Sequence, residues 1–205
     1  MMFHLNELQH DALVEIFNLG VGQAAAAMSA IVNEEVVMSV PSITFQTRAE
    51  AAKALGSGEG RRICAITQTY EGAFNTEAIL MFPEEKSLEI VRLMVGQTLT
   101  MDELSEMEQE AMSEIGNIIL NCCVGTMANI SGGELHGSLP VYRVGTGDEI
   151  LGSFGKEWNG VVLTLKIDFN IERHRINGYV AFLLDLTALK DLRHYIDQYI
   201  ARLTP

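Results

Sequence analysis

Apolar side chains recur at helical spacing in two long stretches of the chain. From about residue 7 to 31, and again from about residue 106 to 131, they return every three or four positions, as on a helix that packs one face against a core. Both stretches are rich in alanine, glycine and methionine. The pattern predicts two long helices, each with one apolar and one polar face.

Start and stop signals flank both stretches. Asn6 with Gln9, and Ser105 with Glu108, have the spacing of a capping box, in which two side chains satisfy backbone amides at the start of a helix. These pairs predict that the helices begin near residues 7 and 106. Residues suited to end a helix follow at Asn33 and at Gly132-Gly133.

Elsewhere the pattern changes to short apolar runs rich in β-branched residues and bounded by turn residues, which is typical of strands. The predicted strands are Val36 to Val40, Ile43 to Thr47, Arg62 to Tyr70, Thr76 to Phe82, Ser138 to Val144, Val161 to Phe169 and Gly178 to Leu184. Two further helices are predicted at Glu84 to Val95 and Ala188 to Arg202, whereas Leu151 to Lys156 is ambiguous. The glycine-rich run Gly56 to Gly60 lies between strand-like segments, which favours a hairpin or loop over a phosphate-binding turn.

The order of elements repeats. When the sequence is shifted by 99 positions, the segment 11–18 aligns with 110–117, and further matches extend from position 5 to position 41. We therefore predict one domain, residues 1–205, built from two repeats at about 5–98 and 104–203. If the halves share one sheet by pseudo-twofold symmetry, each half covers the strand edges that the other half would expose on its own.

Composition narrows the classes of function. The 205 residues are 48% hydrophobic and 20% charged, which is typical of an ordered globular protein. A formal net charge of -13 makes nucleic acid a poor partner, because no basic stripe could neutralise a phosphate backbone. The N-terminus resembles no signal peptide and no apolar run suggests a membrane span, so we expect a cytoplasmic protein without a membrane partner.

The cysteines and histidines indicate no metal site. Cys64, Cys122 and Cys123 offer neither a disulfide framework nor the spacing of a metal-binding motif, and are interpreted as buried thiols. The five histidines also lack metal-ligand spacing. We therefore expect no metal and no cofactor bound by this chain.

A polar stripe runs along each predicted long helix. At 100° per residue, Asp11, Glu15 and Asn18 lie within an arc of about 60°, opposite the apolar face. Glu110, Glu114 and Asn117 form the same stripe in the second repeat. A single acid and amide one turn apart would be an ordinary solvated face. Their retention in both repeats, among neighbours that mostly differ, favours a functional role.

The spacing of these residues resembles the active-site signature of the CheC, CheX and FliY phosphatases of chemotaxis. It reads Asp11-x3-Glu15-x2-Asn18-x22-Pro41 in the first repeat and Glu110-x3-Glu114-x2-Asn117-x22-Pro140 in the second. With two signatures and no additional flagellar switch segment, the chain is more similar to CheC than to CheX or FliY.

The resemblance implies an α+β fold in which long motif-bearing helices flank a mainly antiparallel sheet of about six strands. It also implies an enzyme that hydrolyses the aspartyl phosphate of a CheY-like receiver domain. Asn18 and Asn117 would position the attacking water, and Glu15 and Glu114 would pair with a lysine of the receiver. Mg²⁺ would belong to the receiver, and CheD is a further expected partner.

Two departures from the family signature concern activity. Phe17 replaces the usual glycine before Asn18, and helical geometry places it on the buried side, so we expect altered packing there. Glu110 is longer than the usual residue at its position, which predicts unequal sites. The alternative function is a binding module that docks on a receiver or on CheD without hydrolysis; intact asparagines in both repeats favour the enzyme.

Overall fold

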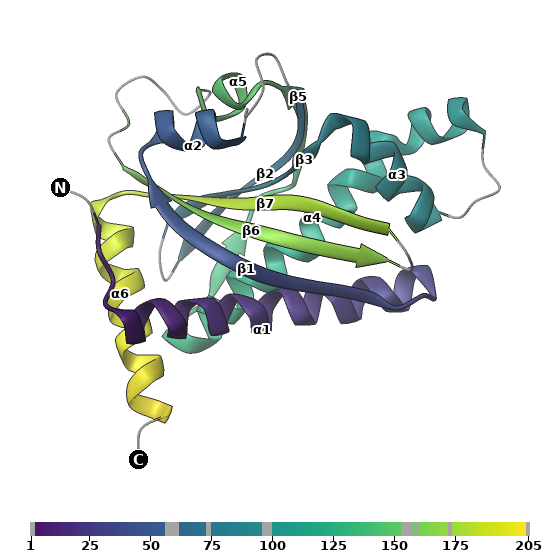
Figure 1. Ribbon diagram of the computed structural model, residues 1–205. Coiled ribbons are helices and arrows are strands. Elements are labelled where there is room, and N and C mark those ends of the chain that lie inside the picture. The colour runs from purple at the N-terminus through teal and green to yellow at the C-terminus, as the bar shows by residue number, and fades with distance from the viewer. Residues whose placement is uncertain are drawn as a thin grey trace.

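The computed structural model describes residues 3–55, 62–72, 75–95, 100–152, 158, 160–171 and 174–203. A single antiparallel sheet forms its centre (Figure 1), with the strand order β1-β6-β7-β3-β2-β4 and with β5 also paired to β2. The strands are β1 (Val36–Gln46), β2 (Ile63–Gly72), β3 (Thr76–Pro83), β4 (Leu135–Gly137), β5 (Val141–Gly145), β6 (Val161–Ile171) and β7 (His174–Leu184). The predicted fold class, an antiparallel sheet flanked by long helices, is confirmed.

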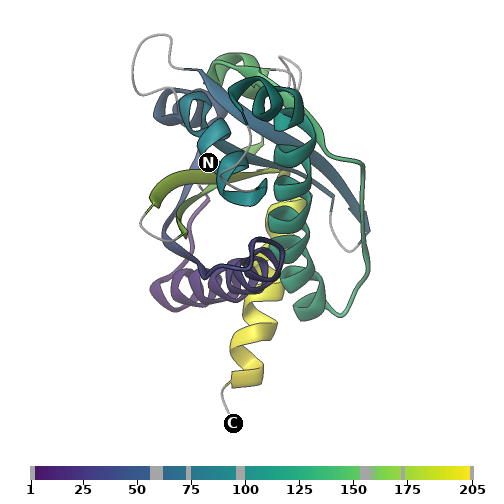
Figure 2. The same cartoon turned by 90° about the vertical axis from the view of Figure 1, so that its right-hand side faces the viewer.

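Four helices cover one face of this sheet, which we call the helix face. They are α1 (Glu7–Val32), α3 (Glu84–Val95), α4 (Met101–Ser131) and α6 (Leu186–Leu203). The larger hydrophobic core lies between them and the sheet. In Figure 2, α1 is seen nearly end-on beside α4. A side chain at Gly20 would place its Cβ 2.9 Å from the Cα of Cys123, so glycine allows these two helices to cross closely.

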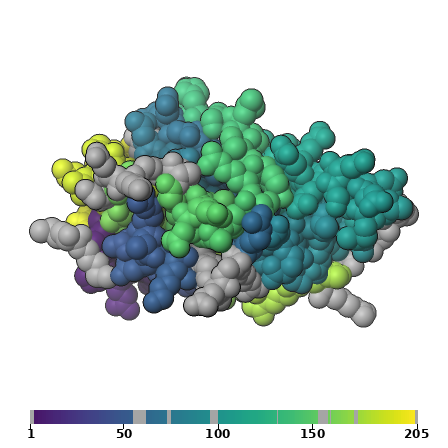
Figure 3. Space-filling model, turned by 90° about the horizontal axis from the view of Figure 1, so that it is seen from above, coloured from purple at the N-terminus to yellow at the C-terminus, as the bar shows by residue number. Residues whose placement is uncertain are grey.

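Two short helices cover part of the opposite face, which we call the outer face. They are α2 (Arg48–Leu55) and α5 (Gly147–Gly152), which lie against each other over a second, smaller core. Figure 3 shows both on the surface of this side, α2 in blue and α5 in green. Neither was predicted, and α5 includes the start of the ambiguous segment 151–156. The predicted loop 56–60 lies outside the described residues.

The two halves exchange their first strands. Counted from the N-terminus, β1 pairs with β6 of the second half, and the equivalent strands β4 and β5 pair with β2 of the first half. Both pairings shift register at about the equivalent place: between Ser39↔Asp168 and Ser42↔Lys166, and between Gly137↔Tyr70 and Val141↔Thr67. The central pair, β3 with β7, joins the halves.

The strand at one edge of the sheet is longer than predicted. The predicted segments Val36 to Val40 and Ile43 to Thr47 merge, except for Thr47, into the single strand β1, because Pro41 falls in the register shift of an edge strand, where a residue without an amide proton is tolerated. In the second half the same irregularity is larger and separates β4 from β5. The predicted strand Ser138 to Val144 is therefore wrong in its first residues.

The first capping box is confirmed and the second is wrong. The Asn6 side chain accepts from the Gln9 amide at 2.8 Å, and the Asn6 amide donates to Gln9 Oε1 at 3.1 Å. At α4 the box is formed instead by Thr100 and Glu103, so the helix begins at Met101. Both long helices end at left-handed residues, Asn33 (φ 55°) and Gly132 (φ 70°), as predicted.

The buried groups are those expected of a core. Cys64 and Cys123 are fully buried and Cys122 is half-buried, all as free thiols, and burial raises the pKa of Cys64 and Cys123 to about 12. By length and composition, α1 is long and apolar enough to span a membrane, contrary to the expectation from the sequence that no segment would be. Its apolar side chains Leu13, Phe17 and Val21 are nevertheless fully buried in the helix-face core, the arrangement of a core helix.

Candidate functional site

Both polar stripes lie where the helical periodicity predicts them. On α1, Asp11 and Glu15 are exposed and Asn18 is half-buried; on α4, Glu110 and Glu114 are exposed and Asn117 is half-buried. We call the residues on α1 the first site and those on α4 the second site. In each, an acid reaches into solvent one turn before an amide that is partly enclosed by the sheet.

In the first site the sheet backbone holds the amide. Asn18 Oδ1 accepts a hydrogen bond from the backbone N–H of Val40 at 2.9 Å. Val40 lies in the register shift of β1, where it is not paired with a residue of β6, and Asn18 accepts from its N–H. Because a backbone N–H can only donate, the oxygen of Asn18 must face the strand and its NH₂ group is left for other partners. Pro41 follows directly and is exposed.

In the second site side chains hold the amide. Asn117 Oδ1 accepts from Gln68 Nε2 at 3.1 Å and from Asn121 Nδ2 at 2.8 Å. Gln68, on β2, also donates to the backbone carbonyl of Ser138 at 2.9 Å, within the break between β4 and β5. In the first site, Asn18 therefore bonds directly to the irregular part of the strand. In the second site, Gln68 connects Asn117 to the equivalent break.

A buried tyrosine completes this network. The hydroxyl of Tyr70 lies 3.1 Å from Gln68 Oε1 and 2.9 Å from Asn121 Oδ1. Only 1% of Gln68 and 2% of Tyr70 is exposed, so the two polar side chains depend on each other for hydrogen bonds. Burial raises the pKa of Tyr70, which keeps its hydroxyl protonated and able to donate.

A glycine lets α4 approach the sheet at this point. A Cβ on Gly116 would lie 2.4 Å from Cγ2 of Ile66 on β2, closer than packed atoms come. The equivalent residue of α1 is Phe17, which is fully buried as predicted and stacks on Phe182 with ring centroids 5.4 Å apart. The two helices therefore contact the sheet differently beside their asparagines.

The apolar surroundings of the two sites also differ. Val40, beside Asn18, is buried with 3% exposed, whereas Leu139 at the equivalent position is 85% exposed. Pro140 follows Leu139 and is half-buried, while Pro41 is exposed. The break between β4 and β5 turns Leu139 outward, so the second site carries an apolar side chain that the first site lacks.

Sequence reasoning missed two of the residues that hold the second site. Gln68 and Tyr70 are separated by one residue on β2, so both point to the helix face, where β2 otherwise presents the buried apolar Cys64 and Ile66. Polar side chains at core-facing positions of a strand are the signal that could have indicated them. Asn121 lies one turn after Asn117 on α4, at the position where the first repeat has Gly22.

The arrangement can orient groups but provides no nucleophile. Each stripe offers a carboxylate and a carboxamide of fixed orientation, which suit hydrogen bonding to a partner's polar groups and to water. Among the described residues, no cluster of three or more histidine, cysteine, aspartate or glutamate residues could hold a metal ion. Within that part of the chain, Glu15 and Glu114 form no ion pair.

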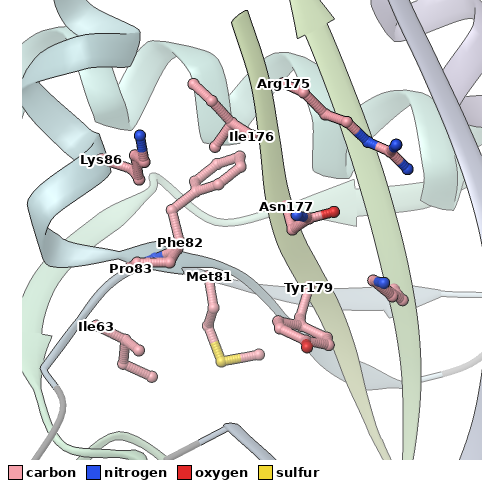
Figure 4. Close-up of a pocket in the computed structure, with 10 residues that line it drawn as sticks. Ile63, Met81, Phe82, Pro83, Lys86, Arg175, Ile176, Asn177 and Tyr179 are labelled. Carbon is pink, nitrogen blue, oxygen red and sulfur yellow. The ribbon is translucent and has the colours of Figure 1, made fainter.

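A separate pocket of about 310 Å³ lies largely on the outer face, between β6, β7, β3 and the start of α3 (Figure 4). Three cations line it, and Lys86 and Arg175 lie on opposite sides in the figure. Two of them are already paired: Lys86 Nζ lies 2.6 Å from Glu89, and Arg175 donates to Asp168 at 2.7 Å. The third is Lys166. The pocket contains no motif residue and is not the candidate site.

Comparison with known proteins finds curated relatives, among them two proteins of Bacillus subtilis. No family model matches the chain. It is 26% identical to the CheY-P phosphatase CheC of Bacillus subtilis over 139 residues, which cover 66% of this chain and 66% of that protein. It is 25% identical to the flagellar motor switch phosphatase FliY of the same organism over 195 residues, or 92% of this chain. That match spans about half of the relative, 49%.

The fold agrees with a solved structure. The crystal structure of Thermotoga maritima FliY matches with a TM-score of 0.75 at 17% identity, covering 96% of this chain and all of that chain. At this identity the match concerns the fold alone. The sheet and its flanking helices are thus shared with FliY.

Proposed function

We propose that the chain, which resembles the CheC, CheX and FliY phosphatases in its two sites and its fold, is a phosphatase that hydrolyses the aspartyl phosphate of a CheY-like receiver domain. The names of the two curated relatives, CheY-P phosphatase and flagellar motor switch phosphatase, support this reaction class. The observation that carries the proposal is the pair of sites, each with an exposed glutamate one turn before an asparagine whose carboxamide is held by the sheet.

The reaction needs water, and neither site has to supply a nucleophile. Water attacks phosphorus, the bond between phosphorus and the aspartyl oxygen breaks, and inorganic phosphate and the free carboxylate leave. Phosphoryl transfer with a loose transition state gains mainly from orientation of the nucleophile. Asn18 and Asn117 would orient the water through the carboxamide. Since their oxygens are held by the protein, the amide hydrogens are the groups that reach outward.

The glutamates would fix the partner. Glu15 and Glu114 are exposed one turn from the asparagines, where each could accept a charge-assisted hydrogen bond from a lysine of the receiver. Such a pair sets the register between the helix and the receiver, so the asparagine enters the phosphorylated pocket. Mg²⁺ would lie in the acidic pocket of the receiver and not on this chain.

Release of inorganic phosphate from a phosphorylated receiver tests the proposal. Wild-type protein should accelerate release, Asn18→Ala and Asn117→Ala should each remove the contribution of one site, and the double variant should leave only the receiver's own rate. Asn129→Ala is the matched control, because Asn129 is an exposed asparagine of α4 that lies off the stripe; it should keep full activity.

Two outcomes would contradict the proposal. One is a double variant as active as the wild type, which would show that the asparagines take no part in the reaction. The other is a wild-type protein that binds phosphorylated receivers from a panel yet never speeds release. That second result would support the docking module instead.

A further inference from the structure

We propose that Gln68 is a positioning residue of the second site, which holds Asn117 in the orientation that the reaction requires. The inference rests on the proposed phosphatase function and extends it to a residue outside the motif. Gln68 lies on β2, in the other half of the chain, and touches Asn117 through Nε2 at 3.1 Å.

The orientation of Gln68 follows from its neighbours. The carbonyl of Ser138 can only accept, so the contact of 2.9 Å requires the NH₂ group of Gln68 at that end. The same NH₂ group then donates its second hydrogen to Asn117 Oδ1, while Tyr70 lies within hydrogen-bonding distance of Gln68 Oε1. Reversing the amide of Gln68 would break both donor contacts, and because only 1% of Gln68 is exposed, water could not replace them.

This network determines which atoms of Asn117 remain available. Its oxygen already accepts from both Gln68 and Asn121, so both acceptor positions are used. The carboxamide cannot rotate by half a turn without placing its NH₂ group against two donors. Asn117 is therefore left with its Nδ2 hydrogens directed away from the sheet, and Gln68 is the buried group that enforces this choice.

The first site has no such network. The residues equivalent to Gln68, Tyr70 and Asn121 are Ile167, Phe169 and Gly22, none of which has a polar side chain. Ile167 and Phe169 are fully buried, and Asn18 is held by the backbone of Val40 instead. A change at position 68 should therefore alter the second site and leave the first unchanged.

The test places Gln68→Ile, which copies the first half, in two single-site backgrounds. With Asn18→Ala, only the second site acts, and we expect kcat to fall about 10- to 100-fold with KM for the phosphorylated receiver unchanged, as for a misplaced reacting group. With Asn117→Ala, only the first site acts, and the same substitution should change neither constant. Tyr70→Phe, which copies Phe169, should give a smaller loss with the same selectivity.

A measurement without receiver provides a second readout. Both hydrogens of Gln68 Nε2 are bonded, so its side-chain amide signals in a ¹⁵N spectrum should exchange slowly with water. In Gln68→Ile the Asn117 amide signals should shift, and those of Asn18 should stay in place. Such a pattern also shows that the variant is folded.

The inference is overturned if Gln68→Ile lowers kcat equally in both backgrounds, if it lowers kcat in neither, or if the Gln68 amide exchanges rapidly. Failure of the phosphatase proposal looks different, because then the double asparagine variant would match the wild type whatever residue stands at position 68.

Discussion

At the scale of single residues, the two halves differ at the position before the asparagine. Gly116 brings α4 against Ile66, and Phe17 instead fills the space beneath α1. The sequence showed that Phe17 would be buried, because helical periodicity assigns faces. It could not show the consequence at Gly116, since a close approach depends on which strand lies opposite, and periodicity does not determine that.

Gly116→Ala should destabilise the protein by about 1–3 kcal/mol, because the new Cβ collides with Ile66 and the core must shift to admit it. Urea unfolding followed by far-UV circular dichroism measures the change. Gly125→Ala in the same helix is the control: no atom lies within 4 Å of its Cβ position, so it should stabilise by about 0.5–1 kcal/mol. Equal effects of the two substitutions would refute the packing argument.

At the scale of secondary structure, capping-box spacing located the start of one long helix correctly and that of the other wrongly. The box of Asn6 and Gln9 was predicted correctly from its own spacing. Ser105 and Glu108 have the same spacing, but the helix already runs through Ser105, and Glu108 instead accepts from Ser87 and Tyr142. The helices α2 and α5 were missed because short segments carry too little periodicity to distinguish them from loops.

The start of α4 gives a direct comparison of two serine or threonine positions. Thr100→Ala removes the N-cap acceptor for the Glu103 amide and should lower the free energy of unfolding by about 1 kcal/mol. Ser105→Ala lies within the helix, where alanine is the better helix former, and should cost nothing or stabilise slightly. Thermal unfolding of both variants decides which pair, Thr100 and Glu103 or Ser105 and Glu108, caps α4. A larger loss of stability for Ser105→Ala would support the box predicted at Ser105.

At the scale of the whole molecule, the exchange of first strands makes the halves depend on each other. The sequence indicated two repeats sharing one sheet, but it did not indicate which half receives β1. Within each repeat the strand pattern is the same, so pairing with either half satisfies it equally. The observed register, with β1 on β6 and β5 on β2, means that neither half has a complete sheet alone. The repeat boundaries near 98 and 104 stay a prediction.

We therefore expect a single cooperative unfolding transition. Trp158 packs against the outer-face core, so its fluorescence reports on that side, whereas far-UV circular dichroism reports on all helices. The two signals should give the same midpoint in urea. Phe17→Ala, in the helix-face core, should shift both midpoints together by an amount equivalent to about 3–5 kcal/mol. Separate transitions for the two signals would show that the halves unfold independently.

The same strand exchange has a consequence during synthesis on the ribosome. Val36 pairs with Ile171, so β1 leaves the exit tunnel long before its partner has been translated. Until β6 emerges, the nascent first half presents an unpaired strand edge of eleven residues, the kind of edge at which chains aggregate. Pro41 and the register shift interrupt that edge in its middle. The irregularity that orients Asn18 in the folded protein thus also shortens the aggregation-prone strand edge of the nascent chain.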